Sequence, residues 1–202
     1  MRPILDDARA ACAAVTAGVS WAAYHGAGLA VFPEAYLDGH GYDRETIARR
    51  ARALTDPEIR GLAASLRGFP VTVVVGMFER RGNSLRNVAL LLRAGEIAGV
   101  YAKARPNENG VAAGQDMPVF EADGRRFAIN ICNDANDPDL ARRAREGGAS
   151  VLCFPLNNVL PPATAERWRE RSIGNLVARA KARVPEGTTG RIVLDLNPRQ
   201  CE

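Results

Sequence analysis

The sequence predicts an α/β protein, in which helices alternate with strands that form layered sheets. Three observations lead to this prediction. Helical periodicity runs over 6–23 and 44–67, the run 71–78 is continuously apolar and rich in β-branched residues, and two hairpin signals follow it along the chain. A continuous β-branched run is typical of a strand that is buried on both faces, as happens when helices cover a sheet.

The first half of the chain supplies most of the predicted helices. The stretch 44–67 is interrupted at Asp56-Pro57, where a proline favours the start of a new helix. Between the helical stretches 6–23 and 44–67, the apolar run 28–34 is strand-like and ends in a glutamate. This half therefore predicts a helix, a short strand, a broken helix and the buried strand 71–78, in that order.

The second half is dominated by hairpins. Ala94-Gly95 and Asp123-Gly124 are dipeptides typical of tight turns between paired strands. The elements expected here are strands at 87–93, 96–101, 118–121 and 125–131, a helix at 138–146, a strand at 150–155 and a helix at about 164–183. Since no repeat, linker or low-complexity segment interrupts the order, we expect a single domain over 1–202.

Composition excludes several classes of protein. A chain of 202 residues with 47% apolar and 25% charged residues is ordinary for a globular domain and buries about 70% of its unfolded surface. The net charge is only +4, and the arginines are spread through predicted helices instead of gathering with aromatic residues, which argues against a nucleic-acid partner. No apolar run approaches the roughly 20 residues of a membrane span, and the start of the chain is too short in apolar residues for a signal peptide. A cytoplasmic location without membrane contact is expected.

The cysteines do not suggest a metal site. The four of them include no CxxC pair and no histidine at ligand spacing, so we expect no metal. Cys12 lies in an alanine-rich helical stretch and Cys153 in an apolar run, and both are interpreted as small buried residues. Cys132 differs, because polar residues follow it at once.

Three strand-like runs each deliver one reactive side chain to the point where the strand ends. Glu34 ends the run 28–34, Lys103 follows 96–101, and Cys132 follows 125–131. A thiol with an ordinary pKa near 8.5 is only a few per cent ionised at neutral pH, so a nucleophilic cysteine needs a base or a neighbouring positive charge. A carboxylate and an ammonium supply one of each, and an ammonium can also stabilise an oxyanion.

These residues stand in motifs that resemble the nitrilase or carbon-nitrogen hydrolase superfamily. The motifs are Phe32-Pro33-Glu34, Tyr101-Ala102-Lys103 and Ile131-Cys132-Asn133-Asp134, and they follow one another in the family's order. The resemblance continues through 148–155 and 168–180. It implies a four-layer α-β-β-α sandwich, a Glu-Lys-Cys triad, and a reaction that needs no metal or organic cofactor.

The resemblance also implies two departures from the family's pattern. Members usually open with a strand before the first helix, whereas here the helical stretch begins almost at once. The stretch 184–196 resembles the family's terminal strand region, yet it follows 181–183 directly, without the intervening strands. The chain is thus interpreted as a truncated member, lacking its first strand and an internal segment near residue 182.

The family's chemistry implies a role for each triad residue. Glu34 takes the thiol proton, Cys132 attacks the carbon of an amide or nitrile, and Lys103 with the backbone N–H of Asn133 stabilises the negative charge that develops on oxygen. Glu34 then passes its proton to the departing amine and activates the water that releases the acid from a thioester. We expect a small linear amide as substrate, with N-carbamoyl amino acids and nitriles as alternatives.

Further residues are candidates for the site. Glu108 stands where many members carry a second glutamate, although a plain turn residue is an equal interpretation. Tyr36, Asn136 and Asn157 are candidate pocket residues by position, and the alternative for the asparagines is a turn or cap. Asp134 is expected to be a structural acceptor that holds the loop.

Two further interpretations stay open. No motif pairs His25 or His40 with Cys132, so a Cys-His hydrolase is the weaker interpretation. A rival hypothesis is a catalytically inactive remnant, because the loss of strands from a sandwich exposes edges and apolar faces. Family members commonly pair through helices near the cysteine, which implies a homodimer or higher homo-oligomer formed by the helices after Asn136 and around Trp168.

Overall fold

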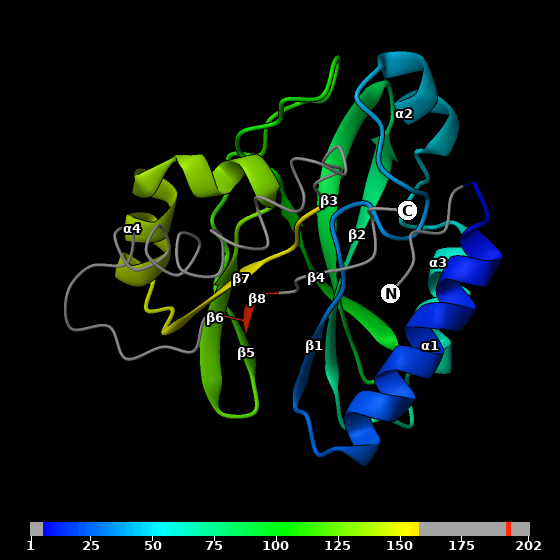
Figure 1. Ribbon diagram of the computed structural model, residues 1–202, viewed down its shortest axis with the longest axis vertical. Coiled ribbons are helices and arrows are strands. Elements are labelled where there is room, and N and C mark those ends of the chain that lie inside the picture. The colour runs from blue at the N-terminus through cyan, green and yellow to red at the C-terminus, as the bar shows by residue number, and fades with distance from the viewer. Residues whose placement is uncertain (1–5, 158–192, 195–202) are drawn as a thin grey trace, which may run out of the picture.

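The computed structural model describes residues 6–157 and 193–194, and within them two four-stranded sheets pack face to face (Figure 1). Helices α1 and α3 cover the outer face of the first sheet, and α4 lies outside the second (Figure 1). The α/β class and the four-layer sandwich that the sequence predicts are therefore confirmed. The described helices are α1 Ala8–Tyr24, α2 Arg44–Arg50, α3 Pro57–Ser65 and α4 Pro138–Glu146, with a 3₁₀ helix, η1, at Cys132–Asn136.

The first sheet has the order β1-β2-β3-β4, and the second has the order β5-β6-β7-β8. In the first, β1 runs parallel to β2, and the next two pairs are antiparallel hairpins. In the second, β5 and β6 form an antiparallel hairpin, followed by two parallel pairs. The strands are β1 Leu29–Val31, β2 Thr72–Arg81, β3 Ser84–Arg93, β4 Glu96–Ala102, β5 Phe120–Ala122, β6 Arg125–Ile129, β7 Val151–Phe154 and β8 Val193–Leu194.

Local chemistry explains where the helices begin. An aspartate caps each of the four α-helices by accepting a backbone N–H two or three residues along, and a proline occupies the first turn of α3 and α4. Side-chain acceptors at this position satisfy N–H groups that the helix leaves without partners. The predicted break at Asp56-Pro57 is the start of α3, and the helix at 138–146 is found with the bounds expected. The capping aspartates are Asp7, Asp43, Asp56 and Asp137.

Both predicted hairpins are present. The turn residues Ala94-Gly95 and Asp123-Gly124 all have positive φ, as the tight turn of a right-twisted hairpin requires. The sequence did not predict the hairpin that joins β2 to β3 around Gly82, because residues 79–86 are mostly polar or charged. Residues 80–83 at the turn are exposed to solvent, whereas Glu79 and Leu85 on either side of it are buried.

Some predicted elements fall outside the described residues. The helix expected at about 164–183 lies there, and so does most of the stretch 184–196, of which only β8 is described. Residues 1–5, which bear on the first strand, also lie outside the described part.

The two faces of the first sheet serve different purposes. Along β2, Val73, Val75 and Met77 pack against α1 and α3, whereas Val74 faces the second sheet. The second sheet contributes Phe127 and Ile129 to the apolar layer between the sheets. Since successive side chains of a strand point to opposite faces, each residue of β2 and β3 is committed to one layer. The candidate site lies at one end of the apolar layer between the two sheets.

Gly76 on β2 lets the segment that carries Glu34 lie directly against the sheet. A Cβ atom at this position would stand 2.4 Å from the backbone N of Ala35 and 2.7 Å from the carbonyl oxygen of Pro33. The Gly76 carbonyl also accepts the backbone N–H of Leu37 at 3.1 Å. Because Gly76 has no side chain, the loop that follows β1 can pack directly against the backbone of β2.

We expect Gly76→Ala to destabilise the protein by about 1–3 kcal/mol, because the methyl group would force this loop off the sheet. Urea unfolding followed by circular dichroism measures the change. Gly61→Ala is the matched control, since nothing lies within 4 Å of that added methyl on α3 and alanine is favoured over glycine in a helix by about 1 kcal/mol. Equal stability of the two variants would contradict the close approach.

Candidate active site

The three segments that carry the predicted triad end next to one another. Glu34 follows β1 and Lys103 follows β4, which are the two edges of the first sheet, while Cys132 follows β6 of the second sheet and opens η1. Glu34 and Lys103 are both almost fully buried, and their side chains meet with 2.8 Å between Oε1 and Nζ. The structure thus brings the predicted carboxylate and ammonium into direct contact.

Lys103 stands between two carboxylates. Its Nζ donates to Oε1 of Glu34 and to Oε1 of Glu108, both at 2.8 Å, and to Oδ1 of Asn107 at 3.1 Å. Burial opposes the charged form of the lysine, but the two carboxylates outweigh it and raise the pKa of Lys103 above its ordinary value. The ammonium is therefore charged at neutral pH and has all three of its hydrogens bonded.

Asn87 joins the two glutamates from the middle of β3. Its Nδ2 donates to Oε1 of Glu34 at 2.8 Å and to Oε1 of Glu108 at 2.7 Å. Sequence analysis missed this residue, although a signal was present. An asparagine that alternates with Ala89 and Leu91 on a buried strand is a polar side chain aimed into the layer between the sheets.

His40 is the second residue that sequence analysis missed. Its Nε2 lies 3.3 Å from Oε1 of Glu108 and 3.6 Å from Oε1 of Glu34, and its side chain is 9% exposed. Burial lowers the pKa of this imidazole, but the bonds to Glu108 and Glu34 outweigh burial and raise the pKa to about 9. His40 contacts the carboxylates of Glu108 and Glu34, and these contacts have no signal in the local sequence.

The environments of the two glutamates differ. Glu108 is saturated: its Oε1 accepts from Asn87, Lys103 and His40, and its Oε2 accepts the backbone N–H of Asn107 at 3.0 Å. These donors and the nearby charges overcome burial and hold the pKa of Glu108 well below its usual range. In Glu34, by contrast, the buried Oε2 accepts no hydrogen bond within the described part of the chain.

Cys132 opens η1 in a strained backbone conformation. Its φ is +44°, in the left-handed region that L-residues seldom adopt. The backbone N–H donates to the carbonyl oxygen of Pro155 at 3.0 Å, which ties the cysteine to the end of β7. Burial and the charge of Glu34 raise the pKa of the thiol to about 12, against the opposing charge of Lys103. The resting cysteine is a neutral thiol.

Asp134 holds the turn after Cys132, as the sequence predicts. Its carboxylate accepts the Tyr101 hydroxyl at 2.8 Å and the backbone N–H groups of Ile131 at 2.9 Å and Arg105 at 2.7 Å. These bonds join the start of η1 to β4 and to the loop that follows Lys103. Burial is the main cause that raises the pKa of Asp134, and the bound donors oppose it.

The predicted pocket residues differ in burial and in their contacts with the candidate site. Asn157 is buried and its Nδ2 donates to the backbone oxygen of Glu34 at 3.4 Å. Asn133 follows the cysteine in η1, where a backbone N–H has no partner within the helix, and its side chain donates to the Arg105 carbonyl. Asn136 is exposed and donates to Asn133 at 3.0 Å. Tyr36 packs in the core beside Phe32, with ring centroids 5.6 Å apart.

One group of side chains has the ligand types of a metal site. Oxygen atoms of Glu34 and Glu108 and a ring nitrogen of His40 all lie within 4.8 Å of one another. The Lys103 ammonium, however, lies 2.8 Å from both of these carboxylate oxygens. A divalent metal ion would have to displace the buried, hydrogen-bonded ammonium of Lys103. These side chains therefore fit an ammonium group and not a metal ion.

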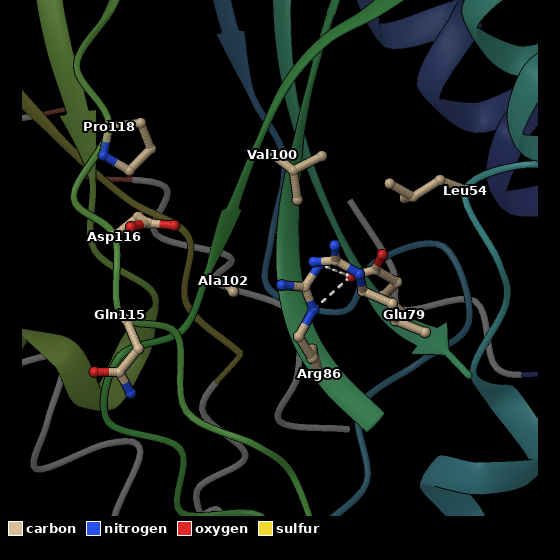
Figure 2. Close-up of a pocket in the computed structure, with 9 residues that line it drawn as sticks. Leu54, Glu79, Arg86, Val100, Ala102, Gln115, Asp116 and Pro118 are labelled. Carbon is tan, nitrogen blue, oxygen red and sulfur yellow. Dashed lines mark hydrogen bonds and ion pairs between the residues drawn. The ribbon is translucent and has the colours of Figure 1, made fainter. Parts of the chain in front are cut away.

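A cavity of about 430 Å³ lies on the other face of the first sheet (Figure 2). The paired side chains of Glu79 and Arg86 line it, together with Val100 and Ala102 of β4. Alternation along the strands separates this cavity from the candidate site, since Arg86 is next to Asn87 and Ala102 is next to Lys103. The cavity is not lined by Glu34, His40, Asn87, Lys103 or Glu108.

The fold and the site together define a sandwich with a buried Glu-Lys pair beside a strained cysteine. A model of the carbon-nitrogen hydrolase family matches residues 3–183. The chain belongs to the carbon-nitrogen hydrolase family.

Similar proteins agree with this assignment. The chain is 29% identical over 142 residues to the "Hydrolase in pqqF 5'region" of Pseudomonas protegens, which covers 67% of this chain and 50% of that protein. It is 27% identical over 156 residues to the deaminated glutathione amidase of Escherichia coli O157:H7, covering 73% and 60%. The chain thus spans half or somewhat more of the length of these two relatives.

Solved structures show the same fold. A cysteine-to-alanine variant of the Nesterenkonia AN1 amidase has a TM-score of 0.70 and 21% identity, over 90% of this chain and 69% of that one. The Nit3 protein of Saccharomyces cerevisiae, from the nitrilase superfamily, has a TM-score of 0.67 and 15% identity, over 90% and 67%. Within the described residues of this chain, no helix has both the length and the apolar character of a membrane span.

The raised pKa of Cys132 leads to a prediction about its reactivity. We expect the rate of alkylation of Cys132 by iodoacetamide to keep rising from pH 7 to pH 10, because only the thiolate reacts and the thiol titrates at about 12. Mass spectrometry of the Cys132 peptide measures the rate. Burial raises this pKa most and remains in Glu34→Gln, but the variant removes the negative charge that raises it further. The alkylation rate of the variant should therefore level off at a lower pH than that of the unaltered protein.

The buried Cys153 is the internal control, because it is fully covered and its peptide should stay unlabelled in both proteins. A plateau between pH 7 and 8 in the unaltered protein would show a resting thiolate and contradict the prediction.

Proposed function

We propose that this chain hydrolyses a small linear amide to a carboxylic acid and ammonia or an amine, through a thioester on Cys132. The observation that carries the proposal is the buried contact of Lys103 with Glu34, beside a thiol whose pKa responds to both charges. A nucleophile, a base and a charged oxyanion donor then stand within one site. Membership of the family supports this reaction class.

Glu34 is the proposed general base. Its Oε1 is committed to Asn87 and Lys103, whereas its Oε2 is buried without a hydrogen bond from the described residues. We assign the proton transfer to Oε2. Oε1 already accepts two hydrogen bonds, whereas no described residue donates to Oε2, which leaves that oxygen to accept the proton of the thiol.

The reaction then has two halves. Oε2 of Glu34 takes the Sγ proton as Sγ attacks the amide carbon, and the negative charge moves to the amide oxygen, where Lys103 and the N–H of Asn133 stabilise it. The carbon–nitrogen bond breaks, Glu34 returns the proton to the leaving nitrogen, and the thioester remains. Glu34 next takes a proton from water, whose oxygen attacks the thioester carbon. The carbon–sulfur bond then breaks and the acid leaves, and Glu34 returns the proton to Sγ, which restores the thiol.

The high pKa of Cys132 fits this coupled transfer. A thiol that titrates near 12 is neutral at rest, but its thiolate is intrinsically a strong nucleophile, because nucleophilicity rises with pKa. Attack and proton transfer must therefore occur together, and a substrate carbonyl has to be present. Such a cysteine stays protected from oxidation between turnovers.

Glu108 is proposed as a positioning residue. All four of its hydrogen-bond donors are in place, and its pKa is far below that of a base at neutral pH. Its charge fixes Lys103 beside Glu34. The two carboxylates that contact Lys103 are thus proposed to act differently, Glu34 as the base and Glu108 as the positioning residue, because their environments differ.

The first test compares ammonia release from small amides, N-carbamoyl amino acids and nitriles by the unaltered protein and by Cys132→Ala. We expect release from small amides and a loss of at least about 10³-fold in the variant. Cys12→Ala is the matched control, since Cys12 lies on α1 and plays no part in the reaction. No release from folded protein would favour the inactive remnant, and release from carbamoyl compounds or nitriles alone would reassign the substrate.

A second test separates the two carboxylates. Glu34→Gln should lower kcat/KM by about 10³-fold through loss of the base, whereas Glu108→Gln should lower it by about 10–100-fold through loss of a positioning charge. Steady-state kinetics with the best amide of the panel gives both values. A larger loss for Glu108→Gln than for Glu34→Gln would overturn the assignment of the base.

A further inference from the structure

His40 lies in a setting that requires a proton on the ring nitrogen that faces the carboxylates. Its Nε2 faces Oε1 of both glutamates, at 3.3 Å for Glu108 and 3.6 Å for Glu34, and only 9% of the side chain is exposed. Both of these oxygens also accept the Lys103 ammonium and the Asn87 amide. An acceptor nitrogen in this position would point its lone pair at two carboxylate oxygens.

The groups packed around His40 come from several elements. Tyr42 stands edge-on at 4.7 Å and Phe78 of β2 at 5.9 Å between ring centroids. Arg50 of α2 donates through Nη1 to the His40 carbonyl oxygen, which fixes the backbone. The charged groups that face the ring are thus Glu34 and Glu108. Lys103 pairs with Glu34, and the remaining titratable neighbour is the phenol of Tyr42, which is exposed.

The charge count of the cluster depends on this histidine. Glu34 and Glu108 contribute two negative charges, and Lys103 contributes one positive charge. Without a second positive charge the buried cluster would carry a net negative charge next to the place where an oxyanion forms. Buried charges that are not balanced are costly, and an oxyanion beside a negative cluster is destabilised.

We propose that His40 is a positioning residue of this site, an imidazolium that pairs with Glu108 and Glu34 and makes the buried cluster neutral. Its role in catalysis rests on the proposed function, but its protonation does not. The imidazolium keeps Glu108 saturated and leaves the positive charge of Lys103 available to the developing oxyanion. When His40 loses its proton, Lys103 alone balances two carboxylates.

The pH dependence follows from the direction of the shift. The folded-state pKa of His40 is about 9, above the ordinary 6.5 of an unfolded chain, so its stabilising contribution is complete below about pH 6.5 and is lost as the pH rises through 9. Catalysis should lose its support from His40 over the alkaline part of the same window.

The chain has two histidines, which makes the test direct. We would follow the imidazole Cε1–H signals by ¹H–¹³C NMR from pH 5.5 to 10.5 in untagged protein, with His40→Gln and His25→Gln to assign them. His25 is exposed at the end of α1, where it contacts Trp21 and Tyr24. The signal absent from His40→Gln should titrate near pH 9, and Glu108→Gln should lower that midpoint. A midpoint at or below 7 would overturn the proposal.

The kinetic arm tests the role in catalysis. We expect kcat/KM of the unaltered enzyme and of His25→Gln to fall above about pH 9, and His40→Gln to be on the order of tenfold lower at pH 7.5, without that alkaline decline. A residue that only fills space would lower activity without changing the pH profile, so an unchanged profile in His40→Gln would contradict the role. If no amide is hydrolysed by any protein, the proposed function fails, and the NMR midpoint alone decides the state of His40.

Discussion

The buried ion pair of Lys103 with two carboxylates is the interaction on which the rest of this structure depends. Taking an ammonium out of water costs several kcal/mol, and only close, well-oriented partners offset such a cost. Here Nζ has three acceptors, at 2.8, 2.8 and 3.1 Å, and Asn87 ties the two carboxylates together. Removal of either carboxylate or of the ammonium would leave an unbalanced charge in the core, so these charged residues act as a unit.

The sandwich buries this unit, so that solvent does little to screen its charges. The outer face of the first sheet packs on α1 and α3, and its inner face packs on the second sheet. Because side chains alternate along β3, one strand supplies Val88 and Leu90 to the helix layer and Asn87 to the site. Gly76 on the neighbouring strand gives the Glu34 loop the room to reach that site. The packing of the sheets and the chemistry of the site therefore share the same residues.

Environment, and not residue type, separates the roles of the acidic groups. Asp134 accepts a phenol and two backbone N–H groups and holds the turn that strains Cys132. Glu108 is saturated and anionic, while one buried oxygen of Glu34 accepts no hydrogen bond from any residue that the structure describes. A strained cysteine and a buried carboxylate oxygen with no donor among the described residues are features that a packed core seldom tolerates without a function. Both lie at the ends of the strands that bring the triad together.

Much of the fold and the main residues of the site could be predicted from the sequence. Apolar periodicity, aspartate caps and turn dipeptides are local signals, so the helices α1, α3 and α4 and two of the hairpins were predicted with bounds close to those observed. The residues of the proposed triad could be selected from the sequence because each stands in a short motif at the end of a strand. The hairpin of β2 and β3 was missed, since its polar residues carry no local strand signal.

The contacts of His40 and Asn87 and the different hydrogen-bond environments of Glu34 and Glu108 could not be read from short motifs. Their roles rest on contacts between residues that lie far apart along the chain, such as Asn87 with Glu34 and His40 with Glu108. A pKa depends on burial and on the charges within a few ångströms, and neither quantity is encoded in the neighbouring residues of the chain. The sequence by its local patterns thus specified the elements and the candidate reactive groups. Only the packing of two sheets decided that Glu108 is saturated by donors, whereas one oxygen of Glu34 accepts no hydrogen bond from the described residues.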